Sequence, residues 1–203
     1  MMGLLMMEVY LSAAHNVMLL IMTVTSANKT LSTLTSHIAS SGGPEYSFVD
    51  IDPVNDKDGG QPGGNIRVAY LYDSSVIQLR NPNPGTNKQA IDIQPDGSLT
   101  YNPGLIDPTN SAWEESRKPL VAEWEMVDGK TGGHFVTINV HFSSKYGSTP
   151  LEGDARPPVN GGVEYRTSQA EVVAVSYPLT NNLSNRRRTL HPPSSQHPQT
   201  PTS

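Results

Sequence analysis

The feature that most constrains this fold is a pair of alternating apolar segments joined by a short polar turn. Segment 120–126 places an apolar residue at every second position, and segment 134–142 does the same from Val136 onward. Period-two alternation is typical of strands with one buried face, and the turn at 128–133 favours an antiparallel hairpin. We expect the two apolar faces to pack into a core with each other or with their strand neighbours. These faces contain Val136, Ile138, Val140 and Phe142 in one strand and Leu120, Ala122 and Trp124 in the other.

Weaker patterns predict two more strands and two helices. Apolar runs at 66–72 and 76–79 predict short buried strands. Leucine and isoleucine at helical spacing predict a helix from residue 26 to the Gly42-Gly43 stop, capped by Ser26 or Asn28. A second helical segment is expected at 167–174, with Thr167 as its cap. Segment 50–64 lacks an apolar period, so we interpret its four aspartates, Asp50, Asp52, Asp56 and Asp58, as turn residues of a long loop.

The two ends of the chain differ from the middle. Residues 1–25 are an atypical apolar segment, which Glu8, His15 and Asn16 interrupt too often for a membrane span. They lack the basic start of a clear signal peptide. Residues 176–203 form a tail rich in Pro, Ser and Arg without a hydrophobic period, and such a tail is expected to be disordered. One domain is therefore expected at 26–175.

Composition limits the chemistry of this domain. Only 35% of the residues are hydrophobic, with 17 Gly and 17 Pro, so a loop-rich domain containing β-strands fits better than a helical bundle. The net charge of −5 gives no overall attraction to nucleic acid, and a phosphate contact would need a local cluster of cations. Because the chain has no cysteine, disulfides, thiolate zinc sites and cysteine nucleophiles are excluded.

Four segments in a fixed order carry a resemblance to a known family. They are 63–72 (GGNIRVAYLY), 116–121 (SRKPLV), 139–145 (NVHFSSK) and 166–170 (RTSQA). As a set they resemble the endonuclease/exonuclease/phosphatase superfamily with its DNase I-like fold, and most closely its extracellular-nuclease branch of bacteria and fungi. The resemblance spans 42–173. It implies an α/β (α+β) four-layer sandwich of two mixed β-sheets flanked by helices, here a partial copy, and an extracellular location.

The resemblance also implies a function and a set of site residues. The family hydrolyses phosphodiesters with Mg²⁺ or a similar divalent ion, so the expected partner is nucleic acid or another phosphodiester. His141 matches the family histidine that contacts the scissile phosphate and assists as an acid, a role suited to its pKa near neutrality. Arg117 would bind phosphate oxygens with its planar fork, and Lys145 lies in the same pattern as His141. Asn65 and Arg67 are candidates for orienting the substrate, with loop ordering as an equal alternative.

The metal ligands of the family are largely missing from this sequence. Glu8 is the candidate for the early glutamate ligand, and neither the Asp-x-Asn pair nor the closing Asp-His pair occurs after Val173. Hard divalent cations need several oxygen ligands. We therefore expect a weakly active or inactive copy, truncated or altered by a gene prediction that is wrong at both ends. The alternative is a catalytically dead module that binds phosphate or nucleic acid.

Overall fold

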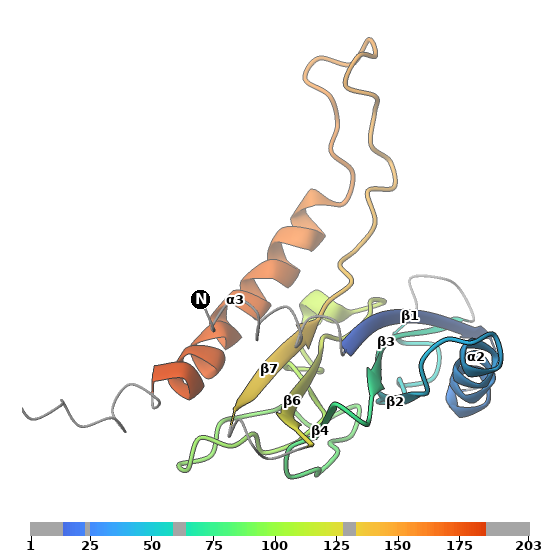
Figure 1. Ribbon diagram of the computed structural model, residues 1–203. Coiled ribbons are helices and arrows are strands. Elements are labelled where there is room, and N and C mark those ends of the chain that lie inside the picture. Colours follow the sequence, from blue (N-terminus) through green and yellow to red (C-terminus); the bar gives the residue numbers. More distant parts are fainter. Residues whose placement is uncertain (1–13, 23–24, 59–63, 128–132, 186–203) are drawn as a thin grey trace, which may run out of the picture.

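A computed structural model describes residues 14–22, 25–58, 64–127 and 133–185 of the chain. These residues form an α+β structure of antiparallel strands with one helix near the start and one at the end of the described chain (Figure 1). Its elements are β1 (Ala14–Met22), α2 (Asn28–Ser40), β2 (Tyr46–Asp50), β3 (Gly64–Asp73), β4 (Ile77–Leu79), β5 (Gly104–Leu105), the 3-10 turn η1 (Ser111–Trp113), β6 (Leu120–Met126), β7 (His134–Asn139) and α3 (Val163–Asn185).

The strands form two sheets. The first has the order β1-β3-β2, and the second has the order β4-β6-β5 with β7 also paired to β6. All pairings between these strands are antiparallel, whereas the family resemblance implies mixed sheets. The predicted hairpin of β6 and β7 is confirmed, and its short connection requires the antiparallel order because a parallel pair needs a longer crossover.

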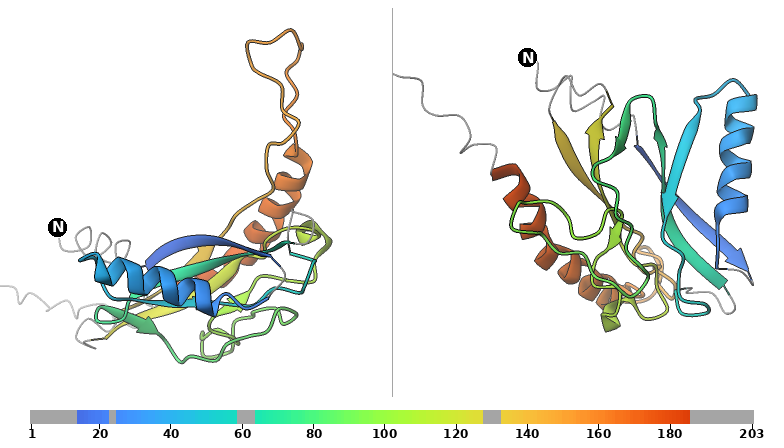
Figure 2. Two further views of the ribbon diagram at one scale, coloured as in Figure 1. Left: turned by 90° about the vertical axis from the view of Figure 1, so that its right-hand side faces the viewer. Right: turned by 90° about the horizontal axis from the view of Figure 1, so that it is seen from below.

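The two sheets pack face to face through β3 and β6. Val68 and Tyr70 point from β3 into a core that contains Leu120 and Trp124 of β6. The rings of Tyr70 and Trp124 meet edge to face with centroids 5.5 Å apart, a favourable geometry for two aromatic quadrupoles. The opposite face of β3 packs Leu71 against Leu31 of α2, so α2 covers the outer side of the first sheet (Figure 2).

The outer face of the second sheet packs against α3 and the segment around 91–106. Val121 of β6 is buried there with Val136 and Ile138 of β7 and Val172 of α3. The described residues therefore lie in four successive layers, which are α2, the first sheet, the second sheet and α3 (Figure 2).

The register of the hairpin decides which residues share each core. Ile138 lies opposite Val121 and Val136 lies opposite Glu123, so the apolar face of β7 joins Val121 rather than Leu120, Ala122 and Trp124. The sequence left two packings open for the apolar face of β7, against Leu120, Ala122 and Trp124 or against the strand neighbours of these residues. The structure shows the second. The predicted strand also ends early, at Asn139, and Val140 is 39% exposed. The reason is that the carbonyls of His141 and Phe142 accept hydrogen bonds from Arg117 instead of a neighbouring strand.

Three other predicted boundaries differ from the structure. The first helix begins after Ala27, which makes no side-chain cap, rather than at a Ser26 or Asn28 cap. The second begins at Val163, and Thr167 lies inside it with its hydroxyl donating to the Val163 carbonyl. This helix continues to Asn185, past the predicted start of the disordered tail at 176. Residues 186–203 lie outside the described part of the chain.

Part of the atypical N-terminal segment belongs to the first sheet. Strand β1 pairs along its whole length with β3, from Ala14 opposite Tyr72 to Met22 opposite Gly64. Within the described ranges, no helix is long and apolar enough to cross a membrane. The 143–162 connection projects from the layered body before the chain returns along α3 (Figure 1).

Candidate functional site

The predicted residues Arg117 and His141 meet at the end of β7. Arg117 precedes β6 and is 9% exposed. Its Nε donates to the His141 carbonyl at 3.2 Å and its Nη2 donates to the Phe142 carbonyl at 2.6 Å. Burial lowers the pKa of Arg117, but a guanidinium remains charged at any physiological pH. Arg117 therefore places a fixed positive charge beneath the 141–145 loop and holds the backbone of that loop.

The two other basic side chains of this loop are open to solvent. The side chains of His141 and Lys145 are both exposed. Partial desolvation and the positive charge of Arg117 lower the pKa of His141 below its ordinary value. A second guanidinium holds the same loop, because Arg166 of α3 donates to the Ser144 carbonyl at 2.8 Å. The 141–145 loop is therefore bordered by two guanidinium groups and presents an imidazole and an ammonium group outward.

Gln169 of α3 connects this loop to the rest of the molecule. Its side chain is 1% exposed, and its Oε1 accepts a hydrogen bond from the Ser143 amide at 2.8 Å. Its Nε2 lies within hydrogen-bond distance of the Ala112 carbonyl and the hydroxyls of Ser116 and Ser143. Asn139 adds a link to the first sheet by donating to the Ala69 carbonyl at 2.9 Å. The four sequence segments of the family resemblance thus meet through Arg117, Gln169 and Asn139.

Asn65 and Arg67 do not face this loop. Asn65 is fully buried, and its side chain accepts from the Asp56 amide and donates to Asn55, both at 3.0 Å. Arg67 makes ion pairs with Asp50 at 3.1 Å and Asp52 at 2.7 Å. Both residues therefore hold the 50–58 segment against the start of β3. This agrees with the alternative role given to them above, the ordering of a loop.

Three of the four aspartates interpreted as turn residues also make ion pairs, and one of these, Asp50, is the last residue of β2. Asp50 and Asp52 pair with Arg67, and the buried Asp58 pairs with Lys118. Burial raises the pKa of Asp50 and of Asp58, although the hydrogen bonds from Arg67 and Lys118 act in the opposite direction. Asp56 has a φ of 57°, the left-handed backbone conformation that some turn positions require. Sequence spacing gave no sign of these ion pairs, since the partners are separated by 15 to 60 residues.

The described residues do not fit a Mg²⁺ ion by themselves. Glu8, the predicted metal ligand, lies outside the described part of the chain. The three aspartates Asp50, Asp52 and Asp58 are each paired with Arg67 or Lys118. Within the described ranges, no group of three or more His, Asp or Glu side chains is placed to hold a metal ion.

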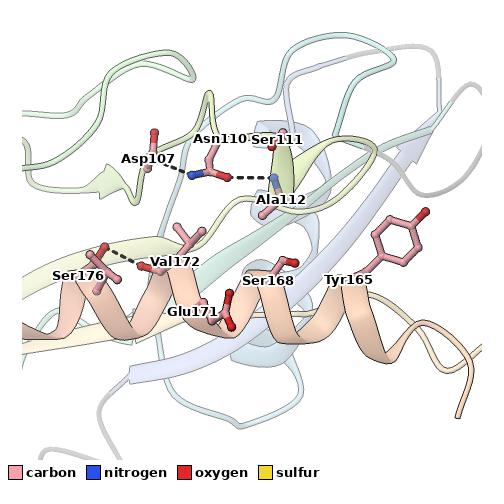
Figure 3. Close-up of a pocket in the computed structure, with 10 residues that line it drawn as sticks. Asp107, Asn110, Ser111, Ala112, Tyr165, Ser168, Glu171, Val172 and Ser176 are labelled. Atoms are coloured by element: carbon pink, nitrogen blue, oxygen red, sulfur yellow. Dashed lines mark hydrogen bonds between the residues drawn. The ribbon is translucent and has the colours of Figure 1, made fainter.

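A cleft of about 520 Å³ lies beside the 141–145 loop, between α3 and the 107–112 segment (Figure 3). Asp107, Asn110 and Ser111 line one wall, and Tyr165, Ser168 and Glu171 of α3 line the other. Arg117 and His141 do not line it. Gln169 separates the two sites, because it bonds to Ala112 in the cleft wall and to Ser143 in the loop.

Gln169 is the residue of this site that the sequence did not single out. It lay within a quoted segment, but glutamine is common on exposed helix faces. The available signal was its position three residues before Val172, which places a polar side chain on the helix face that packs against the core.

Comparisons of the chain with protein-family models, with curated proteins and with solved structures found no match.

Proposed function

We propose that this chain is a DNase I-like domain of the endonuclease/exonuclease/phosphatase class and that its 141–145 loop binds the phosphate of a phosphodiester. The observation that carries the proposal is the position of Arg117 under this loop. Its guanidinium lies 3.2 Å from the His141 carbonyl and 2.6 Å from the Phe142 carbonyl, while His141 and Lys145 remain exposed. In a chain of net charge −5, a local site with a guanidinium, an ammonium group and an imidazole donor is what binding an anion needs.

Two further observations support the family assignment. The four quoted segments meet in space through hydrogen bonds of Arg117, Gln169 and Asn139. The order of layers, α2, two sheets and α3, agrees with the sandwich that the resemblance implies.

Phosphodiester hydrolysis is the expected activity of the class, with Mg²⁺ as the expected cofactor to stabilise charge on the phosphate. His141 would contact a phosphate oxygen and donate a proton from its imidazolium form, which its lowered pKa makes a stronger acid but a smaller fraction of the protein at neutral pH. Because the Asp-x-Asn and Asp-His pairs of the family are missing after Val173, we expect weak or no turnover from this chain. The second candidate, a binding module without catalysis, is favoured by the ion pairs of Asp50, Asp52 and Asp58.

The test is the affinity of the full chain for a labelled single-stranded oligonucleotide, measured by fluorescence anisotropy in buffer without divalent ions. His141→Ala and Lys145→Ala should each weaken binding about fivefold, as expected for an exposed charged contact worth about 1 kcal/mol. Lys29→Ala, which removes an exposed lysine on α2, is the matched control and should bind like wild type. Equal affinities for all four proteins would contradict the proposal. Mg²⁺-dependent cleavage of the oligonucleotide by wild type would favour the enzyme over the binding module.

A further inference from the structure

The cleft between α3 and the 107–112 segment has a chemistry that is opposite to that of the 141–145 loop. Two carboxylates, Asp107 and Glu171, line it together with the apolar side chains of Val172 and Val175. Carboxylates repel a phosphate group, while apolar side walls favour a flat uncharged ligand. The cleft therefore does not fit a second phosphate.

One side chain in the cleft offers a stacking surface. The ring of Tyr165 is 70% exposed and stands at the end of the cleft in the first turns of α3 (Figure 3). An exposed tyrosine ring can stack on a nucleobase of any sequence. Glu171, two turns further along the helix, is exposed and can accept a hydrogen bond from an exocyclic amino group.

The cleft lies next to the proposed phosphate site. Gln169 spans the space between them, with its Nε2 3.0 Å from the Ala112 carbonyl of the cleft and its Oε1 2.8 Å from the Ser143 amide of the loop. At the Tyr165 end, the neighbouring Arg166 donates to the Ser144 carbonyl at 2.8 Å. The Tyr165 end of the cleft is therefore the end that adjoins the 141–145 loop.

We infer that this cleft binds the base of a nucleotide whose phosphate lies on the 141–145 loop, so the substrate class is nucleic acid rather than a smaller phosphoester. The inference rests on the proposed function for its phosphate half. A base with an exocyclic amino group, such as adenine, matches the carboxylate of Glu171. Tyr165 provides the stacking face, and Val172 and Val175 provide the apolar contact.

The direct test is a titration of the full chain with adenosine, which has no phosphate, followed by amide chemical shifts in NMR. The signals of Tyr165, Ser168 and Val172 should shift and saturate. If the signals at these positions do not shift, the inference is overturned, whether or not the 141–145 loop binds phosphate. Adenosine binding in the cleft without any binding of an oligonucleotide would support the nucleoside cleft and contradict the proposed function.

Variants test the link between the two sites, with (dA)₅ and inorganic phosphate as probes. Tyr165→Ala should weaken (dA)₅ binding at least about fivefold, the lower end for loss of one base–aromatic stack, and leave phosphate binding unchanged. Tyr146→Ala removes a tyrosine that is 93% exposed and does not line the cleft, so it should bind both probes like wild type. Unchanged (dA)₅ affinity in Tyr165→Ala, or an equal loss in both tyrosine variants, would overturn the inference.

Discussion

At the scale of single residues, buried cations determine what the site can do. Arg117 and Arg67 both came from segments of the family resemblance, and both are nearly buried. Arg67 is neutralised by Asp50 and Asp52, whereas Arg117 donates hydrogen bonds to the uncharged carbonyls of His141 and Phe142. The charge of Arg117 is therefore available to the exposed 141–145 loop, and that of Arg67 is not available to a phosphate.

The pKa of His141 responds to the positive charge of Arg117. Desolvation and the charge of Arg117 both hold it below the ordinary value, so Arg117→Gln should raise it toward that value. Arg117→Lys, which keeps the charge but loses the planar fork, is the control and should raise it less. A titration of the His141 imidazole signals by NMR measures the change. An unaltered or lower pKa in Arg117→Gln would show that Arg117 does not act on His141.

Glu123 gives a pH-dependent prediction for stability. Burial acts to raise its pKa, but hydrogen bonds from His134 and Arg80, both at 2.6 Å, outweigh burial and bring it below the ordinary value. A carboxylate with a lowered folded-state pKa stabilises the fold above its unfolded-state pKa and loses this effect as pH falls through the folded value. Glu123→Gln should therefore lower the free energy of unfolding by about 1–3 kcal/mol at pH 7 and by much less at pH 3.

Urea unfolding of wild type and Glu123→Gln at the two pH values measures this difference. Glu125→Gln is the matched control, because Glu125 lies on the same strand face but its side chain is 36% exposed and 4.0 Å from Arg80. The control should change stability by less than the Glu123 variant. A Glu123 effect that stays constant between pH 7 and pH 3 would rule out the carboxylate charge as its source.

At the scale of elements, β6 is the strand on which both cores depend. Its residues from Leu120 to Trp124 are buried on both faces, one toward the first sheet and the other toward α3. Trp124→Ala should lower the free energy of unfolding by about 3–5 kcal/mol, because it opens a large cavity between the sheets. Phe142→Ala, on a side chain only half-buried beyond the end of β7, should cost less. Denaturant unfolding of the two variants gives the comparison, and a larger loss for Phe142 would contradict the packing described.

The elements also show what sequence patterns can and cannot predict. Strands β3, β4 and β6 and the body of α2 follow from local apolar periods, and the structure confirms them. The end of β7 does not, because it depends on hydrogen bonds from Arg117, 24 residues away. The same holds for α3, whose position depends on Gln169 contacting three segments distant in sequence. Contacts of this kind leave no periodic signal.

At the scale of the whole molecule, the expectation of a layered sandwich came from a family resemblance and not from apolar periodicity in the sequence. Local periods cannot show that α2 and α3 cover opposite sides of two stacked sheets. The resemblance also implied mixed sheets and a substrate role for Asn65 and Arg67. The described strands pair antiparallel, and these two residues hold the 50–58 loop in place. The contacts of these two side chains depend on tertiary structure, which a resemblance in sequence does not show.

The central claim is that the 141–145 loop contacts a phosphate directly. The measurement that tests it most directly is an NMR titration of the full chain with a dinucleotide phosphodiester, without divalent ions, in which the His141 imidazole signals are followed. The signals should shift and saturate, and the pKa of His141 should rise, because a bound anion favours the imidazolium. His37, exposed on α2, is the internal reference and should not respond. No shift at His141, or equal shifts at His141 and His37, would contradict the claim.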